Sequence, residues 1–243
     1  MTPSAAVPET APHQARFWWP VLGGGGVLGL FAFVGDEVPG VAGLVILTLT
    51  STGFVWGMAA LLAGYASPHP RSAIRNATTL LLVATVAYYG LILVHGRRWH
   101  SGQLADGSSA AMSGLASVGR HSALWLVASV AAGVTLGWLG TTVRRGTRLR
   151  ASLAAGAAVG LLAGQGLHLV ATFQAWHVLD DPFFLGNLVA AGASVALATV
   201  SVTVLLAYRR ATRSWPTFVA ASVVASVAGA LLWSQIDSIR STM

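Results

Sequence analysis

Residues Gly156–Asp181 read GAAVGLLAGQGLHLVATFQAWHVLDD, and this segment gives the clearest indication of how the chain folds. Its first half places Gly156, Gly160 and Gly164 four residues apart in an apolar run. In a helix this interval puts the three glycines on one face, where the backbone of a second membrane helix can approach closely. We therefore expect this helix to pack at the centre of a membrane bundle.

The second half of the segment carries a polar face. Gln165, His168 and Thr172 follow at intervals of three and four residues, which places them together on one side of the helix. A histidine in such a segment must face protein or water, because lipid offers its ring nitrogens no hydrogen-bond partner. The polar face leads toward Asp180 and Asp181, so we expect any site to lie near that end.

The composition is that of an integral membrane protein. The chain has 243 residues, of which 55% are hydrophobic and 9% are charged, and its mean hydropathy is +0.70. Soluble domains carry about a quarter charged residues. The net charge of +7 would suit a nucleic-acid-binding protein, but the arginines sit at the ends of apolar segments. We therefore expect membrane lipid as a partner and no nucleic acid.

Two missing residue types exclude classes of chemistry. All fourteen basic residues are arginine, so the sequence has no lysine that could form a Schiff base with retinal. It also has no cysteine, which excludes disulfides, thiolate nucleophiles and cysteine-ligated metals. The sequence contains no phosphate-binding loop, GxSxG, HExxH or paired Asp-rich prenyl-diphosphate motif.

Seven apolar segments predict an all-α, integral membrane bundle of seven transmembrane helices. The bundle occupies 17–236, between a disordered tail at 1–16 and a short C-terminal tail at 237–243. The segments are 18 to 26 residues long, and about 20 residues cross the hydrocarbon core. They are Phe17–Val34, Val41–Tyr65, Asn76–His95, Ser122–Val143, Leu149–Phe173, Phe183–Tyr208 and Trp215–Gln235. The longest connection, Arg97–Arg120, is rich in Gly, Ser and Ala and is expected to be a loop.

The arginines orient this bundle. With the N-terminus in the cytoplasm, ten arginines fall on the cytoplasmic side and four on the outside. This distribution obeys the positive-inside rule, so we expect a multi-pass protein of the cytoplasmic membrane with its C-terminus outside. Six of the seven acidic residues fall on the outer side, which the rule does not explain.

Five of the seven histidines lie in or near the outer half, and two interpretations remain open for them. Paired transmembrane histidines can ligate haem b, and His95 with His168 is the pair considered for that role. Alternatively, these side chains are interfacial and lie near headgroups and water. No metal site is expected, and no cofactor unless this pair binds haem.

The outer acids are candidate proton donors. Asp36 and Glu37 end a helix, where a carboxylate opposes the helix dipole and is mildly unfavourable. Asp237 ends the last helix in the same way. Asp181 precedes Pro182 and also fits a helix N-cap, which is its simpler explanation.

Aromatic side chains are candidates for lining a cavity. Trp56 and Trp125 lie well inside their segments, and Tyr88 and Tyr89 occupy the outer third of theirs. Deep aromatics are often ordinary packing, but their faces can also stabilise a cationic intermediate.

Three phrases carry a resemblance to a family: TGFVWGMAA at Thr52–Ala60, YYG at Tyr88–Gly90 and LWLVA at Leu124–Ala128. Over about residues 41–168 the chain resembles uncharacterised actinobacterial multi-pass membrane proteins of unknown function. The resemblance implies no activity. The family pattern has an acid before a glycine near the middle of the fifth helix, where this chain has Gln165.

Three functions of different classes remain. The first is a small membrane enzyme that protonates and cyclises an isoprenoid- or terpenoid-type substrate in an aromatic-lined cavity near the outer mouth. Its size and architecture resemble those of compact membrane terpene cyclases. The second is a solute or proton-coupled transporter. The third is an accessory or haem-binding subunit that packs into a larger complex, or an oligomer, through its glycine-rich faces.

The enzyme interpretation assigns residues to two roles. The catalytic candidates are Asp36, Glu37, Asp180, Asp181 and His168. The substrate-binding candidates are Trp56, Tyr88, Tyr89, Trp125, Gln165, Thr172 and Trp233.

Overall fold

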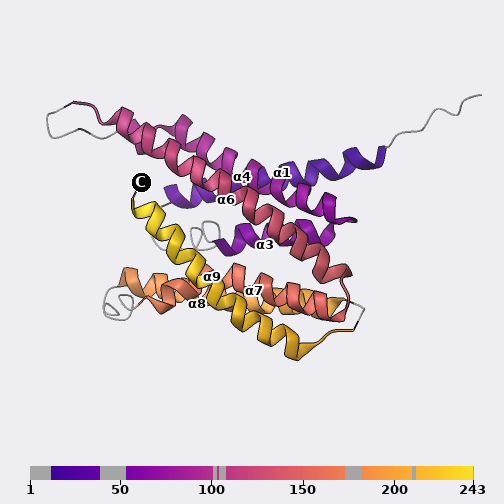
Figure 1. The fold of residues 1–243 in the computed structure, drawn as a ribbon. Coiled ribbons are helices and arrows are strands. Elements are labelled where there is room, and N and C mark those ends of the chain that lie inside the picture. The colour runs from indigo at the N-terminus through magenta and orange to yellow at the C-terminus, as the bar shows by residue number, and fades with distance from the viewer. Residues whose placement is uncertain are drawn as a thin grey trace, which may run out of the picture.

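The fold is a bundle of helices (Figure 1). The computed structural model describes residues 12–38, 53–100, 103, 108–172, 182–209 and 212–242. Its helices are α1 (Pro12–Glu37), α3 (Gly53–Ala66), α4 (Pro70–His95), α5 (Arg97–His100), α6 (Ala111–Arg145), α7 (Arg148–Ala171), α8 (Pro182–Tyr208) and α9 (Trp215–Ser241). This part of the chain contains no β-strand, which confirms the all-α prediction.

Six of these helices are long and apolar enough to cross a membrane: α1, α4, α6, α7, α8 and α9. The seventh apolar helix, α3, has 14 residues and rises about 21 Å, which is less than the roughly 30 Å of the hydrocarbon core. The predicted span Val41–Tyr65 is described only from Gly53 onward, and its first part lies outside the described residues.

Two helix boundaries differ from the expected ones. Helix α1 begins at Pro12, inside the segment expected to be a disordered tail. The prediction that Arg97–Arg120 is a loop is wrong for much of its length, because α5 and the first turns of α6 lie within it. The first turns of α6 pack closely against α5 because Gly114 has no side chain: a Cβ there would lie 2.9 Å from the Cα of Trp99.

The helices pack as two groups that share one core. Helices α1, α4 and α6 lie side by side, and α3 packs against α4 and α6 (Figure 1). In the second group, α7 contacts both α8 and α9 and lies between them. Side chains of α3, α6 and α7 meet in the core, among them Leu61, Leu136 and Leu162.

Helix α7 is the central helix. Of its membrane-length window, 56% is buried inside the protein, against 17–33% for the other five spans. Its glycine face packs on the backbone of α9: a Cβ on Gly164 would lie 2.8 Å from the carbonyl carbon of Gly229, and one on Gly160 would overlap Ala225. The prediction that glycine spacing places this helix at the centre is therefore confirmed.

A second glycine row lies on α6. A Cβ on Gly133 would lie 2.5 Å from the Cα of Thr78, and one on Gly137 would lie 2.7 Å from the carbonyl oxygen of Ala73. These glycines therefore allow α6 to contact the α4 backbone directly. On α3, by contrast, Gly57 faces the side chain of Leu162.

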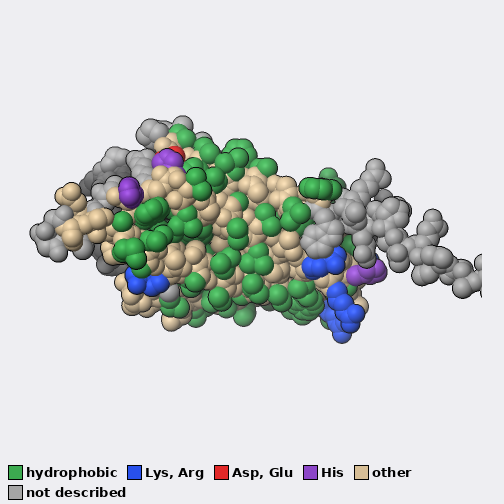
Figure 2. All heavy atoms as spheres, turned by 90° about the horizontal axis from the view of Figure 1, so that it is seen from above, with side chains coloured by type: hydrophobic (Ala, Val, Ile, Leu, Met, Phe, Trp, Pro, Cys, Tyr) green, Lys and Arg blue, Asp and Glu red, His purple; other side chains and the backbone are tan. Residues whose placement is uncertain are grey.

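The outer surface of the bundle is apolar. Large side chains on several helices point outward, including Val224 (71% exposed), Val189 (64%) and Val86 (61%). On the face shown in Figure 2, apolar side chains cover the middle, and the charged side chains lie toward the two ends. This distribution fits a surface that contacts lipid tails around its middle and headgroups at each end.

The two ends differ in charge, and we name them accordingly. The arginine-rich end holds the turns between α3 and α4, α6 and α7, and α8 and α9; its arginines are Arg71, Arg75, Arg144, Arg145, Arg148, Arg150, Arg209 and Arg213. The acidic end holds the C-terminal ends of α1 and α9, with Asp36, Glu37 and Asp237 (Figure 1).

Candidate functional site

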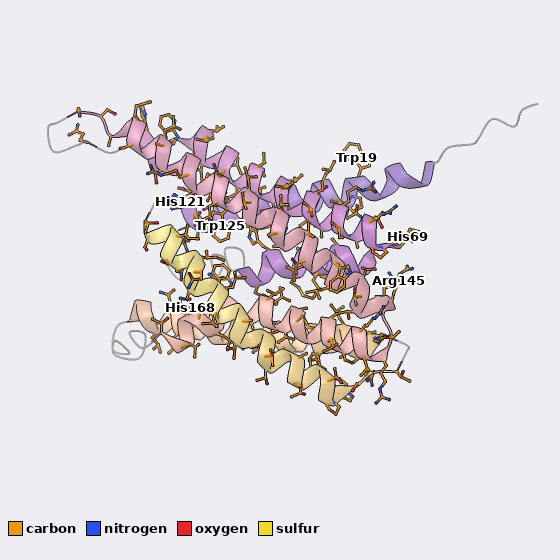
Figure 3. The ribbon with its side chains drawn as sticks, viewed as in Figure 1. Trp19, His69, His121, Trp125, Arg145 and His168 are labelled. Carbon is orange, nitrogen blue, oxygen red and sulfur yellow. The ribbon has the colours of Figure 1, made fainter. Side chains whose placement is uncertain are left out.

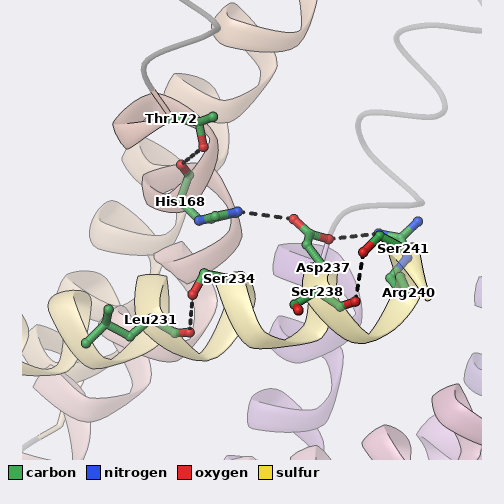
Figure 4. Close-up of polar contacts among 8 residues, drawn as sticks. All are labelled: His168, Thr172, Leu231, Ser234, Asp237, Ser238, Arg240 and Ser241. Atoms are coloured by element: carbon green, nitrogen blue, oxygen red, sulfur yellow. Dashed lines mark hydrogen bonds and ion pairs between the residues drawn. The ribbon is translucent and has the colours of Figure 1, made fainter.

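A polar cluster of His168, Asp237 and Arg240 joins α7 to α9 at the acidic end (Figure 4). Nε2 of His168 lies 3.2 Å from Oδ2 of Asp237. The other carboxylate oxygen accepts a hydrogen bond from Nη1 of Arg240, also at 3.2 Å. The glycine contact between the helices explains this meeting, because Gly164 lies one turn before His168 and fixes the register of α7 against α9.

The cluster is suited to exchanging a proton. Asp237 binds Nε2 of the ring and orients it, which leaves Nδ1 of His168 as the nitrogen available to another molecule. The two side chains are 26% and 46% exposed, so a small molecule can approach them. An ion pair this exposed contributes only about 0–1 kcal/mol to stability. The contact between His168 and Asp237 therefore contributes little to the stability of the fold.

Gln165 lies one turn further into α7 and binds a different helix. Its Oε1 accepts a hydrogen bond of 2.7 Å from the backbone N–H of Gly53. Gly53 is the first residue of α3, and the first N–H groups of a helix have no partner within it. Gln165 thus caps α3 from a neighbouring helix and ties α3 to the cluster.

Aromatic side chains lie beside this cluster. Trp233 is 9% exposed and lies one turn before Asp237 on α9. Its ring lies over Gly53, and its centroid is 6.2 Å from that of Trp125 on α6. Figure 3 shows Trp125 and His168 toward the same end of the bundle, away from Arg145. The predicted residues Gln165, His168, Trp125 and Trp233 therefore gather in one region.

A small cavity opens between α7 and α8. Its volume is about 80 Å³, which is well below the roughly 300–1,000 Å³ of a whole ligand pocket. Its lining residues are Gln165, Gly166, Leu169, Ala191 and Ser194.

Three other predicted site residues, Asp36, Tyr88 and Tyr89, lie in a second cluster between α1 and α4. The hydroxyl of Tyr88 donates a 2.5 Å hydrogen bond to Oδ2 of Asp36. The rings of Tyr88 and Tyr89 meet edge to face, with centroids 5.0 Å apart. His95 also belongs here, because its ring lies 5.6 Å from that of Phe33 on α1. The two histidines considered as haem ligands thus contact different helices.

Other candidates have local roles or cannot be placed. The hydroxyl of Thr172 donates to the carbonyl of His168 at 2.8 Å, within its own helix end. Trp56 packs against the hydrophobic core. Asp180 and Asp181 lie outside the described residues. Among the described residues, no group of three or more His, Asp or Glu could hold a metal ion.

Comparison with protein-family models, with curated proteins and with solved structures found no match to this chain. The structure adds Arg240, which sequence reasoning did not select, and brings in Asp237, an outer acid that was considered but not placed among the catalytic candidates. Asp237 carried a signal, because a carboxylate is unfavourable at the C-terminal end of a helix unless it has a partner. Nothing in the sequence identified that partner as His168.

Proposed function

We propose that this chain is an enzyme of the cytoplasmic membrane that transfers a proton to and from a lipid-soluble, isoprenoid-type substrate at the acidic end of the bundle. The single observation that carries the proposal is the pair of His168 and Asp237 beside Trp233. A partly buried histidine held by a carboxylate next to an aromatic wall suits acid–base chemistry on an apolar molecule.

The proposal includes a topology. The N-terminus is cytoplasmic, Val41–Tyr65 supplies a seventh span, and the acidic end faces the outside. The eight arginines at the opposite end support this orientation by the positive-inside rule. The substrate then reaches the His168 region laterally from the outer leaflet.

Each residue has a defined role in an isomerisation or cyclisation. The protonated imidazole of His168 gives its proton to an epoxide oxygen or double bond of the substrate, and a carbocation forms. The faces of Trp233 and Trp125 stabilise that cation. Loss of a proton from the product cation to the neutral imidazole restores His168, so no proton is gained or lost overall. Asp237 is a positioning residue that orients the ring through Nε2.

The first prediction tests this assignment. Purified protein is incubated with farnesyl- and geranylgeranyl-bearing lipids, including terminal epoxides, and the products are identified by mass spectrometry. His168→Gln should lower turnover by about 10²–10⁴-fold, the usual contribution of general acid–base catalysis. Asp237→Asn should also lower it, because the variant loses the carboxylate that holds Nε2 of the ring in position.

The chain offers two informative controls. His121 lies toward the same end (Figure 3), with Nδ1 2.8 Å from the carbonyl of Ser117, and His121→Gln should keep full turnover. Asp36→Asn tests the acid bound to Tyr88. If turnover survives His168→Gln and disappears in Asp36→Asn, the proton donor is Asp36 and the His168 assignment is wrong.

A second candidate function, a proton-coupled or solute transporter, is favoured by buried hydroxyls between α4 and α6. Thr85 and Ser129 share a hydrogen bond of 2.7 Å, and both are buried. The hydroxyl of Thr78 is buried with no partner among the described residues. Helix α7, by contrast, does not extend a polar path across the bundle, because its face carries no polar side chain between Gln165 and Ser152. Proton or solute flux in liposomes that Thr85→Val abolishes, with no product from isoprenoid lipids, would establish this function instead.

A further inference from the structure

Arg209 is a buried charge with unused hydrogen-bond donors. It follows the last residue of α8 and is only 7% exposed. Nη2 donates a 2.7 Å hydrogen bond to the carbonyl of Gly146, in the turn between α6 and α7. Nε and Nη1 are shut off from solvent and have no partner in the described part of the chain. A buried donor left without an acceptor destabilises the folded state, and more so when it is charged.

The protein itself offers this guanidinium no counter-charge among its described residues. The described acids are Asp36, Glu37 and Asp237, and all three lie at the opposite end of the bundle (Figure 1). Nearby cations add to the excess: Arg145 and Arg148 flank the same turn and are exposed. A negative charge beside this guanidinium would therefore be strongly favoured.

The adjoining helix end also favours an anion. Gly146 immediately precedes Thr147, the N-cap of α7, and Thr147 makes no side-chain capping bond. The first N–H groups of α7 therefore point out of the helix without a side-chain acceptor, and the helix dipole is positive at this end. Helix N-termini of this kind bind phosphate. Arg209 and the start of α7 thus offer donors to the same small region.

We propose that Arg209 and the N-terminus of α7 form a binding site for a phosphate group at the arginine-rich end. The guanidinium is a fixed, permanently charged donor group that forms strong charge-assisted hydrogen bonds to phosphate oxygens. Nε and Nη1, on different edges of the group, can each donate to such an oxygen, because neither has a partner in the described part of the chain. The phosphate belongs to an anionic phospholipid or to soluble phosphate, and the experiment below separates the two. Because the donors are covered in this structure, binding requires a local movement of the side chain.

The test uses the full-length chain in nanodiscs. Thermal unfolding is followed by tryptophan fluorescence in phosphatidylcholine alone and in an equal mixture with phosphatidylglycerol. Wild type should gain on the order of 4 °C in the mixture, as expected for a ligand that binds only the folded state. Arg209→Met should lose most of this gain. Arg209→Lys keeps the charge but not the planar fork, and should keep only part of it.

Arg213→Met is the matched control. Arg213 lies in the same connection, but its Nη1 donates to the carbonyl of Ala207 and its guanidinium lies over the ring of Trp215. This variant should keep the full gain from phosphatidylglycerol. If Arg209→Met and Arg213→Met lose the same amount, the effect is general surface electrostatics and the proposal is wrong.

A second arm distinguishes the source of the phosphate. Protein in neutral detergent is titrated with inorganic phosphate against chloride at equal ionic strength, and lipids retained on the protein are counted by native mass spectrometry. Retention of phosphatidylglycerol that Arg209→Met abolishes assigns the site to lipid. A phosphate-specific stabilisation that Arg209→Met abolishes, without lipid retention, assigns it to soluble phosphate. Absence of both responses overturns the site.

Discussion

Gln165 binds the backbone N–H of Gly53 through its amide oxygen, and a glutamate at this position could accept the same hydrogen bond. Its oxygen accepts the N–H of Gly53, at the positive end of the α3 dipole. A carboxylate there would gain from the dipole but would lose hydration, because the contact is partly buried. The neutral amide satisfies the N–H without placing a charge inside the bundle.

The second prediction concerns this residue. Gln165→Leu leaves the N–H of Gly53 without its acceptor and should lower the free energy of unfolding by about 1–3 kcal/mol. Gln165→Glu keeps the acceptor and should lose less. Thermal unfolding in the same detergent measures both changes. If the leucine variant is as stable as wild type, the hydrogen bond does not hold α3 to α7.

At the residue scale, the sequence predicted which face of a helix a side chain occupies better than it predicted which residue that side chain contacts. The spacing of Gln165 and His168 correctly placed both on one side of α7, since helical periodicity depends on local geometry alone. Thr172 shares that spacing, yet its hydroxyl binds the carbonyl of His168, as hydroxyls near a helix end often do. The pairing of His168 with Asp237 depends on the register of α7 against α9. That register is set by tertiary packing, so it cannot be predicted from the spacing of residues within either helix.

At the scale of elements, the contact between α7 and α9 is made largely by backbone. Gly156, Gly160 and Gly164 face Ala221, Ala225 and Gly229, so no large side chain separates the two helices. Between helices in lipid, such packing replaces the hydrophobic effect as the source of association.

The third prediction compares two glycines. A Cβ on Gly160 would overlap the backbone of Ala225, whereas one on Gly192 of α8 would meet no atom within 4 Å. Gly160→Ala should therefore cost about 1–3 kcal/mol of stability, the usual cost of overpacking. Gly192→Ala should be neutral or stabilise by about 0.5–1 kcal/mol. Thermal unfolding decides the matter, and equal stability of the two variants would contradict the close contact.

Most elements could be predicted from hydropathy, because a run of about 20 apolar residues has few alternatives to a membrane helix. The apolar segments reproduced α4, α8 and α9 within a few residues, apart from the polar first turns of α4 and the last turns of α9. The early start of α6 at Ala111 was missed. Its first turns are polar and Gly-containing, and their packing against Trp99 follows from tertiary contact rather than from propensity.

At the scale of the whole molecule, charge separates the two ends. The described acids lie at one end and eight described arginines at the other. The positive-inside rule relates the arginine-rich end to the cytoplasm, and the acidic end then carries both clusters that hold the predicted site residues.

The fourth prediction tests this orientation. Reporter fusions after Arg150 should report the cytoplasm, and fusions after Asp181 should report the exterior, because one span separates the two positions. Activity of paired cytoplasmic and periplasmic reporters at each position measures the outcome. The reverse pattern would place His168 and Asp237 in the cytoplasm and would remove the outer-leaflet route for the substrate.

The backbone contact of α7 with α9 also has a consequence for synthesis on the ribosome. Helix α7 leaves the ribosome well before the residues that cover its glycine face. At about 5–20 residues per second, the several dozen residues between Gly164 and Gly229 take several seconds to make. During that interval the glycine face of α7 contacts the insertion machinery, lipid or a chaperone. The glycine face of the central helix thus stays uncovered until α9 has been synthesised, and cellular proteases and chaperones can bind it during that time.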